Sequence, residues 1–445
     1  MRQLFGTDGI RGVANKDLTP EMAFRMGRIC AALINERKDD SFITLGMDTR
    51  RSGAMLEGAL VAGICSSGVN VRSLGVLSTP ALAFLTKNLG ASAGIMISAS
   101  HNPIEDNGLK VFASSGYKLS DKLEEEIESY YFKEDELSRP VGAKVGYLIR
   151  DEESVSQYID FLKSISPDYS GLHVAMDCGH GAVYSIAPEV FSALGARITV
   201  LNNTPDGINI NVKCGSTDPS ALRQKVKESG ADFGVAFDGD ADRVIAVDEK
   251  GEIVDGDLLM LLFARYLNAT NKLINKTFVG TIMSNGGVDI AAEENGFSFL
   301  RTAVGDRYVL EKMLEGGFVL GGEQSGHIIF LDYATTGDGL LTALQLAKIL
   351  KEEKKPLSSY NTIMKKLPQV TLNCRVARKD NWEKVASIKE ALDIAYGKIG
   401  AGGRILVRPS GTEPVMRIMV EGDKEEKELH ALASELIDIV ARELN

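Results

Sequence analysis

The chain of 445 residues has few cysteines, no excess of basic residues and no long apolar run. Its five cysteines are odd in number and widely separated, so neither a disulfide framework nor a cysteine zinc site is indicated. The net charge of -11 argues against a nucleic-acid-binding protein, which needs a basic surface. No run approaches the roughly 20 apolar residues of a membrane span, and the first residues lack the apolar segment of a signal peptide. We therefore expect a cytoplasmic protein that has neither nucleic acid nor a membrane as a partner.

Alternating strand-like and helix-like segments predict an α/β protein. Short β-type runs such as 43–47 and 69–74 alternate with helical stretches such as 55–66. A second and a third series repeat this alternation, and beyond 367 the pattern changes to that of a small α+β domain. We predict three tandem α/β domains and a smaller fourth domain, with boundaries at 1–150, 151–252, 253–366 and 367–445.

Ser100 lies in the first of four polar loops that follow strand-like runs. It lies in the segment SASHNP at the end of an apolar run, where open α/β sheets place their ligands. His101, Asn102 and Lys110 supply hydrogen-bond donors for an anionic group. The alternative is a serine that caps a helix. The G-x-S-x-G frame of a hydrolase is absent, so a phosphorylated serine explains the polar, cationic neighbours better than acyl transfer does.

Three aspartates at alternate positions, Asp238, Asp240 and Asp242, form the second loop, DGDADR. Such a concentration of charge is costly unless a hard cation or opposite charges neutralise it, so a divalent metal is the expected partner. A calcium-binding EF-hand is disfavoured, because Arg243 occupies the sixth loop position, where glycine is needed. Solvated turn carboxylates are the remaining alternative. A phosphoserine oxygen could complete the coordination, with magnesium then polarising the phosphoryl group.

The third loop, GEQSGH, combines a carboxylate and a hydroxyl, Glu323 and Ser325, between glycines. This pairing suits the recognition of neighbouring sugar hydroxyls. His327 could act as a base, or it could be a packed histidine without a catalytic role.

The fourth loop, RPSGTEP, brings guanidinium, hydroxyl and backbone donors into a tight turn. This combination suits a phosphate dianion, and a plain hairpin turn is the alternative. The candidate phosphate ligands are Arg408, Ser410, Gly411, Thr412 and Arg417.

Taken in this order, the four loops resemble those of the α-D-phosphohexomutase superfamily over essentially the whole chain. The opening segment FGTDGIRG and the segment TAVGDRY are most similar to its bacterial phosphoglucosamine mutase branch. Members of that branch interconvert glucosamine 6-phosphate and glucosamine 1-phosphate and supply cell-wall precursors. Ala241 is a departure, since many members have glycine there. All three carboxylates remain, so we expect no change in metal binding.

The resemblance implies mixed sheets in the three α/β/α domains, a central cleft, a phosphorylated Ser100 and a possible homodimer. It also implies one Mg²⁺ bound by the three aspartates together with Ser100, and glucosamine 1,6-bisphosphate as intermediate and primer. The implied catalytic residues are Ser100, His101, Lys110, Arg11, Arg243 and His327, and the implied sugar-binding residues are Glu323, Ser325, Gly305 and Asp306.

Three other functions stay open at this point. A phosphoglucomutase or phosphomannomutase of the same superfamily would use the same loops. A sugar-phosphate phosphatase would need water in the site, and the sugar-binding and phosphate-binding loops count against it. A non-enzymatic sugar-phosphate or metal-binding scaffold is disfavoured because Ser100 and all three aspartates occur together.

Overall fold

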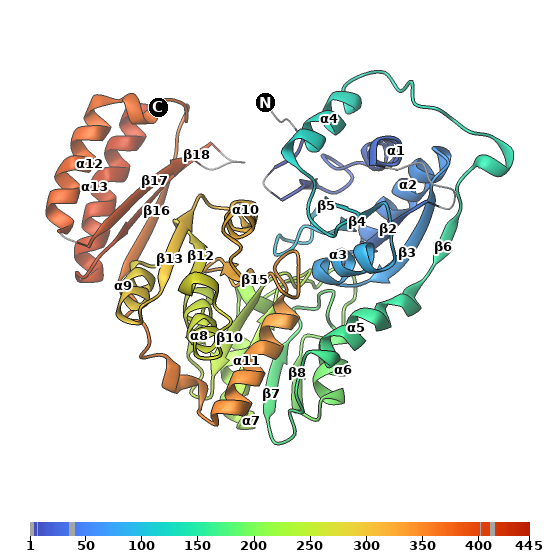
Figure 1. Cartoon of the computed structure of the whole chain (residues 1–445). Coiled ribbons are helices and arrows are strands. Elements are labelled where there is room, and N and C mark those ends of the chain that lie inside the picture. The colour runs from blue at the N-terminus through green and yellow to red at the C-terminus, as the bar shows by residue number, and fades with distance from the viewer. Residues whose placement is uncertain (1–3, 7, 35–40, 401, 410–413) are drawn as a thin grey trace. The chain divides into compact units, whose positions relative to one another are not determined.

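The computed structural model describes residues 4–6, 8–34, 41–400, 402–409 and 414–445 (Figure 1). The chain forms two compact units. The first comprises Met1–Ile282 and Leu300–Asn361, and the second comprises Met283–Phe299 and Thr362–Asn445. Across the described residues, every helix is too short or too polar to span a bilayer.

The first sheet of the N-terminal unit has the strand order β1-β5-β4-β2-β3-β6. Neighbouring strands are parallel from β4 to β6, whereas β5 is antiparallel to both β4 and β1, so the sheet is mixed. The strands are β1 (Ile10–Val13), β2 (Phe42–Met47), β3 (Asn70–Val76), β4 (Ala93–Ile97), β5 (Asp106–Ala113) and β6 (Leu148–Arg150).

Helices cover both faces of this sheet, with α1, α2 and α4 on one face and α3 on the other (Figure 1). Strand β2 shows how its side chains are divided between them. Ile43 and Leu45 join the core beneath α1 and α2, whereas the Thr44 hydroxyl lies 2.8 Å from that of Thr86 in α3. The helices are α1 (Pro20–Ile34), α2 (Gly53–Ser66), α3 (Thr79–Asn88) and α4 (Asp121–Tyr131).

The second sheet has the order β11-β10-β9-β7-β8, with β9 parallel to β7 and antiparallel to β10. Every residue of β9 is buried, as its continuous apolar sequence FGVAF requires. The elements are α5 (Val155–Ser164), β7 (His173–Asp177), α6 (Ile186–Ala193), β8 (Arg197–Leu201), α7 (Ser220–Ser229), β9 (Phe233–Phe237), β10 (Val244–Asp248) and β11 (Ile253–Val254).

The third sheet has the order β13-β12-β14-β15 and is again mixed, since β12 is parallel and β15 antiparallel to β14. Its long helix α11 begins after Asp338, whose carboxylate accepts a hydrogen bond from Leu341 N. The elements are α8 (Gly256–Ala269), β12 (Thr277–Thr281), β13 (Ser298–Thr302), α10 (Asp306–Gly316), β14 (Leu320–Gly322), β15 (Ile328–Phe330) and α11 (Gly339–Glu353).

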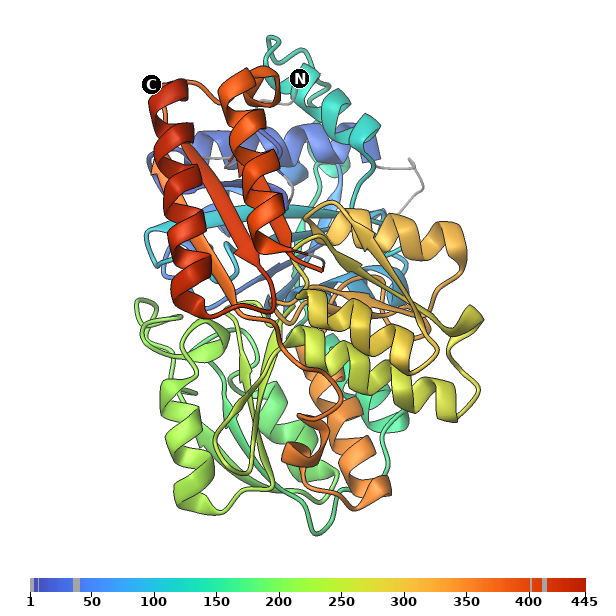
Figure 2. The ribbon, with the colours of Figure 1, turned by 90° about the vertical axis from the view of Figure 1, so that its left-hand side faces the viewer.

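The C-terminal unit contains an antiparallel sheet, β16-β18-β17, with α12 and α13 side by side on one face (Figure 2). Helix α9 belongs to this unit, because the side chain of Asn285 at its start bonds both the N–H and the carbonyl of Leu367. The elements are α9 (Gly286–Glu294), β16 (Gln369–Arg375), α12 (Ala386–Ile399), β17 (Arg404–Pro409), β18 (Val415–Glu421) and α13 (Glu426–Leu444).

The predicted fold class is confirmed: three mixed α/β sheets precede a small α+β sheet. The strand-like runs 43–47 and 69–74 correspond to β2 and β3, and the helical stretch 55–66 lies within α2. The domain boundaries stay a prediction.

Asp338 makes stability depend on pH, because its carboxyl is buried and accepts hydrogen bonds from Leu341 N at 2.9 Å and from the Tyr158 hydroxyl at 2.8 Å. Burial raises the pKa of Asp338 to about 6, against a model-compound value of 3.8. Asp338→Asn keeps the helix cap and removes the titration. Below about pH 4 the carboxyl is neutral in both the folded and the unfolded chain. As the pH rises to 7 the unfolded chain ionises first, so we expect the free energy of unfolding of the wild type to fall by about 2–3 kcal/mol relative to that of Asp338→Asn.

The measurement is the difference in melting temperature, wild type minus Asp338→Asn, at pH 4.5 and pH 7. We expect the difference to be more positive at pH 4.5. Asp160→Asn, on an exposed part of α5, controls for the loss of one surface charge. A difference that is equal at the two pH values contradicts the prediction.

Candidate active site

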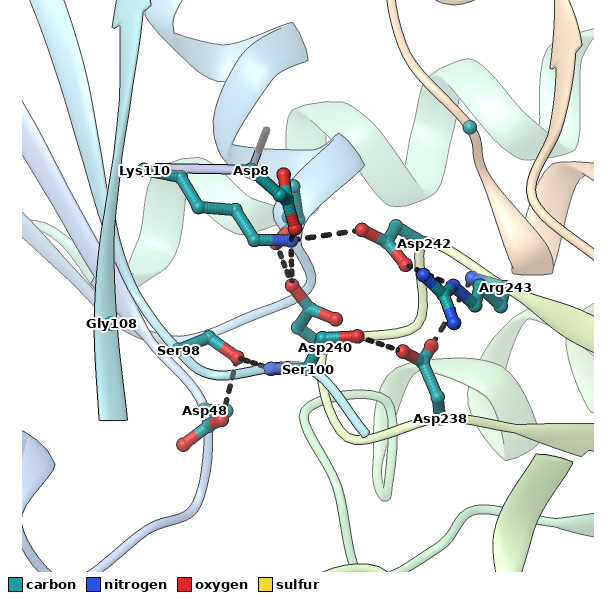
Figure 3. Close-up of polar contacts among 12 residues, drawn as sticks. Asp8, Asp48, Ser98, Ser100, Gly108, Lys110, Asp238, Asp240, Asp242 and Arg243 are labelled. Atoms are coloured by element: carbon teal, nitrogen blue, oxygen red, sulfur yellow. Dashed lines mark hydrogen bonds and ion pairs between the residues drawn. The ribbon is translucent and has the colours of Figure 1, made fainter. Parts of the chain in front are cut away.

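Ser100 lies in the turn after β4, with its side chain directed at the loop after β9 (Figure 3). Its φ of 54° is left-handed, a conformation that residues other than glycine rarely adopt. Its N–H donates to Ser98 Oγ at 2.9 Å, and its hydroxyl donates to Asp238 Oδ2 at 2.5 Å. The next element is β5, so the helix-cap alternative for Ser100 is wrong.

The three aspartates of the second loop converge. One carboxylate oxygen from each of Asp238, Asp240 and Asp242 lies within 4.8 Å of the others. Between them, Ala241 has a left-handed φ of 54° and donates its N–H to Asp238 O at 3.1 Å, which closes the turn. The side chains are 0%, 0% and 4% exposed, so the alternative of solvated turn carboxylates is wrong.

Lys110, on β5, neutralises part of this charge (Figure 3). Its Nζ lies 2.8 Å from Asp240 Oδ2, 2.9 Å from Asp242 Oδ2 and 3.0 Å from Asp8 Oδ2. Burial alone would lower the pKa of Lys110, but these carboxylates outweigh it and hold the pKa well above its ordinary value. Lys110 is therefore a buried ammonium.

The acidic loop keeps coordination capacity for a cation. Asp240 Oδ1 and Asp242 Oδ1 are buried and have no hydrogen-bond partner among the described residues. Burial, followed by repulsion from Asp242 and Asp240, raises the pKa of Asp238 well above its ordinary value. A cation would satisfy the unpartnered oxygens and offset the repulsion. The residues present therefore fit a hard divalent metal ion.

His101 lies between the Ser100 hydroxyl and the Arg243 guanidinium, within hydrogen-bond distance of both. His101 Nδ1 is 3.2 Å from Ser100 Oγ and 3.2 Å from Arg243 Nη1. Burial, helped by Arg243 and Arg11, lowers the pKa of His101 to about 4, so the ring is neutral at physiological pH. A guanidinium can only donate, so Nδ1 is the acceptor and the ring proton lies on Nε2.

Asp8 and Lys118 belong to the same cluster, although the sequence analysis did not single them out. Asp8 pairs with Arg11. Lys118 Nζ lies 2.5 Å from Asp8 Oδ1 and 2.5 Å from Asp306 Oδ2. Asp8 could have been found, because it lies within the same opening segment as Arg11. Lys118 lies in a loop without a motif that would identify it.

The GEQSGH loop connects β14 to β15, and it brings the predicted sugar-binding residues together. Glu323 Oε1 accepts the Gly305 N–H at 3.1 Å, and Ser325 Oγ lies 3.4 Å from Glu323 Oε2. Asp306 follows Gly305 in the first turn of α10. A carboxylate, a hydroxyl and a second carboxylate thus come from two neighbouring segments.

His327 is 2% exposed, and only one of its two ring nitrogens has a hydrogen-bond partner among the described residues. Its Nε2 accepts the Gly337 N–H at 3.2 Å and lies 3.6 Å from Asp306 Oδ2. Its Nδ1 is buried without a hydrogen-bond partner among the described residues. An acceptor at Nε2 places the proton of a neutral ring on Nδ1.

Backbone hydrogen bonds connect the loops to one another. Val244 N donates to Gly326 O at 3.1 Å, and Thr79 N donates to Asp240 O at 3.0 Å. Gly326 has a φ of 90°, and a Cβ at this position would lie 2.0 Å from Val244 O. Only glycine allows this close approach. The acidic loop and the GEQSGH loop are therefore fixed to each other.

The predicted phosphate ligands lie in the C-terminal unit. Arg408 on β17 and Arg417 on β18 occupy directly paired positions of the two antiparallel strands. Their side chains therefore leave the same face of the sheet, next to the connecting loop. Ser410, Gly411 and Thr412 lie outside the described residues.

All four segments of the chain match domains of one family. Residues 2–138 match the α/β/α domain I of phosphoglucomutase/phosphomannomutase, 156–251 match domain II, 255–367 match domain III and 372–439 match the C-terminal domain. The chain belongs to the phosphoglucomutase/phosphomannomutase family. Domains I, II, III and IV follow one another along the chain in the same order as the four loops.

Two full-length relatives are phosphoglucosamine mutases. A phosphoglucosamine mutase from Alkaliphilus oremlandii is 50% identical over 450 residues, which cover 100% of both chains. A phosphoglucosamine mutase from Bacillus mycoides is 53% identical over 428 residues, 96% of each chain.

Solved structures share the fold. A phosphoglucomutase/phosphomannomutase family protein from Burkholderia thailandensis superimposes with a TM-score of 0.82 at 23% identity, covering 99% of this chain and 98% of that one. An N-acetylphosphoglucosamine mutase from Aspergillus fumigatus, solved with GlcNAc-6P and magnesium, has a TM-score of 0.70 at 16% identity, covering 100% and 96%.

The left-handed Ala241 leads to a prediction for stability. Glycine adopts this φ without steric cost, so we expect Ala241→Gly to stabilise the protein by about 0.5–1 kcal/mol despite the loss of one buried methyl group. The control is Ala236→Gly in β9, where φ is not positive and the same change should destabilise by about 1 kcal/mol. Melting temperatures of the two variants measure both effects. Equal destabilisation by both would contradict the strain at Ala241.

Proposed function

We propose that this protein is a phosphoglucosamine mutase that interconverts glucosamine 6-phosphate and glucosamine 1-phosphate. Full-length similarity to proteins of that name supports the substrate. The observation that carries the chemistry is the Ser100 hydroxyl, which lies 2.5 Å from a carboxylate of the buried acidic loop. The product would feed the synthesis of UDP-N-acetylglucosamine and the cell wall.

In the proposed reaction, Ser100 carries the phosphoryl group between two sugar positions. A sugar hydroxyl oxygen attacks phosphorus, the bond between phosphorus and Ser100 Oγ breaks, the electron pair returns to Oγ, and Oγ takes up a proton in exchange for the one that the sugar hydroxyl releases. The resulting glucosamine 1,6-bisphosphate turns over in the site and returns its other phosphoryl group to Ser100. A trace of this bisphosphate would also prime an enzyme that is not yet phosphorylated.

Positive charge near Ser100 supports this chemistry, because phosphoryl transfer depends mainly on positioning and electrostatic stabilisation. We assign Lys110, Arg243 and Arg11 to the phosphoryl oxygens. The neutral His101 ring, with Nδ1 3.2 Å from Ser100 Oγ and 3.2 Å from Arg243 Nη1, would orient the Arg243 guanidinium beside Ser100. The role of His327 is to hold the GEQSGH loop against Gly337, with its Nδ1 proton free for a ligand.

Magnesium is the cation that we propose for the acidic loop. Asp238, Asp240 and Asp242 would hold it, with Ser100 or its phosphate as a further ligand. When bound, it would polarise the phosphoryl group and offset its negative charge. Hard carboxylate donors and the unpartnered oxygens of Asp240 and Asp242 support this assignment.

Two further sets of residues would bind the sugar and the second phosphate of the substrate. Glu323, Ser325, Gly305 and Asp306 would bind the sugar hydroxyls and the amino group. The phosphate that is not being transferred would bind Arg408 and Arg417 together with Ser410, Gly411 and Thr412. A cytoplasmic location and a homodimer are further parts of this proposal, drawn from the kind of substrate and from the family.

Ser100→Ala tests the carrier role. We expect turnover to fall by at least about 1,000-fold, because no group remains to carry the phosphoryl. The melting temperature should stay close to that of the wild type, since Ala241 already occupies a left-handed turn in this protein. The control is Ser120→Ala, which removes a hydroxyl at the start of α4 and should keep turnover. Normal turnover by Ser100→Ala would contradict the mechanism.

Phosphorus NMR with a panel of substrates tests the reaction itself. The protein is mixed with Mg²⁺, a trace of bisphosphate and, separately, the 1-phosphates of glucosamine, glucose and mannose. We expect glucosamine 1-phosphate to be converted to the 6-phosphate fastest, and a chelator to stop the reaction. Faster conversion of glucose or mannose phosphate would replace the substrate with that of a phosphoglucomutase or phosphomannomutase. Release of free phosphate alone would point to a phosphatase.

A further inference from the structure

The turn that carries Ser100 rests on a buried ion pair between Asp48 and Arg50. Both side chains are fully buried, and Arg50 Nε donates to Asp48 Oδ2 at 2.9 Å. They follow β2, the strand that neighbours β4 in the sheet, and so lie beside the start of the Ser100 turn. Burying such a pair is costly unless further hydrogen bonds satisfy both partners, and both partners have them here.

Arg50 satisfies the carbonyl groups of the turn. Its Nη2 donates to Ser100 O at 2.9 Å and to Asn102 O at 2.7 Å. Its Nη1 donates to the carbonyl oxygens of Pro103 and Asp106. A planar guanidinium reaches four acceptors at once, which the single ammonium nitrogen of a lysine does not do.

Asp48 holds the other backbone group of Ser100. Its Oδ2 accepts the Ser98 hydroxyl at 2.7 Å, and Ser98 Oγ in turn accepts the Ser100 N–H at 2.9 Å (Figure 3). The N–H and the carbonyl of Ser100 are thus both tied to one ion pair. A left-handed residue persists only where the surroundings fix it, and this network does so.

A loop of the second sheet region bonds the same carbonyl. Asn211 Nδ2 donates to Ser100 O at 2.8 Å. The residues beside Arg50 are anchored to neighbouring loops, because the Thr49 hydroxyl donates to His180 O at 2.6 Å and Arg51 N donates to Gly207 O at 2.8 Å. Two segments, one after β2 and one that contains Asn211, therefore hold the Ser100 turn.

We propose that Arg50, supported by Asn211, is a positioning residue that fixes the direction of the Ser100 side chain for phosphoryl transfer. The proposal rests on the function proposed above for Ser100. Arg50 acts through the backbone of the turn and touches no reacting atom. A misplacement of about 1 Å at a reacting group costs about 100-fold in rate, whereas the sugar contacts are made by other loops. Removing Arg50 therefore lowers kcat and leaves KM nearly unchanged.

Arg50→Lys tests the proposal against Arg28→Lys. Arg28 is also a fully buried arginine of this unit; it pairs with Asp135 at 2.7 Å and donates to Leu137 O at 2.8 Å. Both variants thus replace a buried arginine that bonds a carboxylate and a backbone carbonyl, and only Arg50 bonds the Ser100 turn. We expect kcat per phosphorylated enzyme to fall about 10–100-fold in Arg50→Lys, with KM within about threefold of the wild type. Arg28→Lys should lower the melting temperature alone. An Arg50→Lys kcat no lower than that of Arg28→Lys overturns the proposal.

Asn211→Gly provides a second test that does not disturb the core. Asn211 has a φ of 59°, which glycine adopts readily, so the change removes the amide while the backbone keeps its conformation. Asn271→Gly, at an exposed position with a φ of 57°, is the matched control. We expect a several-fold fall in kcat for Asn211→Gly and none for the control. Equal kcat values in these two variants would also overturn the proposal, even if Arg50→Lys failed to fold.

The wild type in the same assay separates this proposal from the function on which it rests. Single-turnover transfer of phosphate from phosphorylated Ser100 to glucosamine 6-phosphate is measured by rapid quench. A wild type that forms no phosphoserine contradicts the proposed function. A wild type that transfers phosphate at the same rate as Arg50→Lys contradicts only the positioning role.

Discussion

The pairing of Lys110 with three carboxylates is the interaction on which the rest of the site depends. The chain carries a net charge of -11, and it gathers the buried Asp240 and Asp242 and the partly buried Asp8 around one ammonium. Removing a carboxylate from water costs several kcal/mol unless a partner compensates it. Lys110 supplies that compensation from a strand of the first sheet, while the acidic loop belongs to the second. The charge pairing therefore holds two sheets together at the position where the chemistry is proposed.

Hydrogen bonds to backbone groups hold the loops around Lys110 in place. Ser100 and Ala241 both adopt left-handed turns, and the carbonyl of each is bonded by a neighbouring segment. Asn211 and Arg50 bond the first, and Gly339 N bonds the second at 3.0 Å. Two strained turns face each other because the surrounding loops satisfy their polar groups. Geometry that would be unfavourable in an isolated peptide is thereby stable in the folded chain.

Short sequence patterns predicted the strands and the polar loops that carry the candidate catalytic residues. Continuous apolar runs such as FGVAF in β9 read as buried strands, and a polar segment directly after each strand marks the edge where side chains of different segments meet. Ser100 and the three aspartates were found in this way. The chemistry proposed for them follows from residue type, which is also local.

Long-range partners were not predictable from such patterns. Lys118 contacts Asp8 and Asp306 across sequence separations of 110 and 188 residues, and Arg50 reaches Ser100 across 50. Which distant segments meet is set by strand order, and strand order is not written in any short window. Helix α10 was not predicted, although its buried residues Val309 and Met313 have the four-residue spacing of an amphipathic helix.

The hydrogen bond between Val244 N and Gly326 O has a consequence for how this scaffold can diverge. A side chain at Gly326 would overlap the backbone of Val244, which directly follows the acidic loop, so a shift of the GEQSGH loop at Gly326 would also displace the residues next to the aspartates. The sugar preference proposed for this site would therefore change most directly through side chains such as Glu323 and Ser325 on an unaltered backbone. A GEQSGH loop of different length would instead displace the neighbouring acidic loop, which is proposed to hold the metal ion.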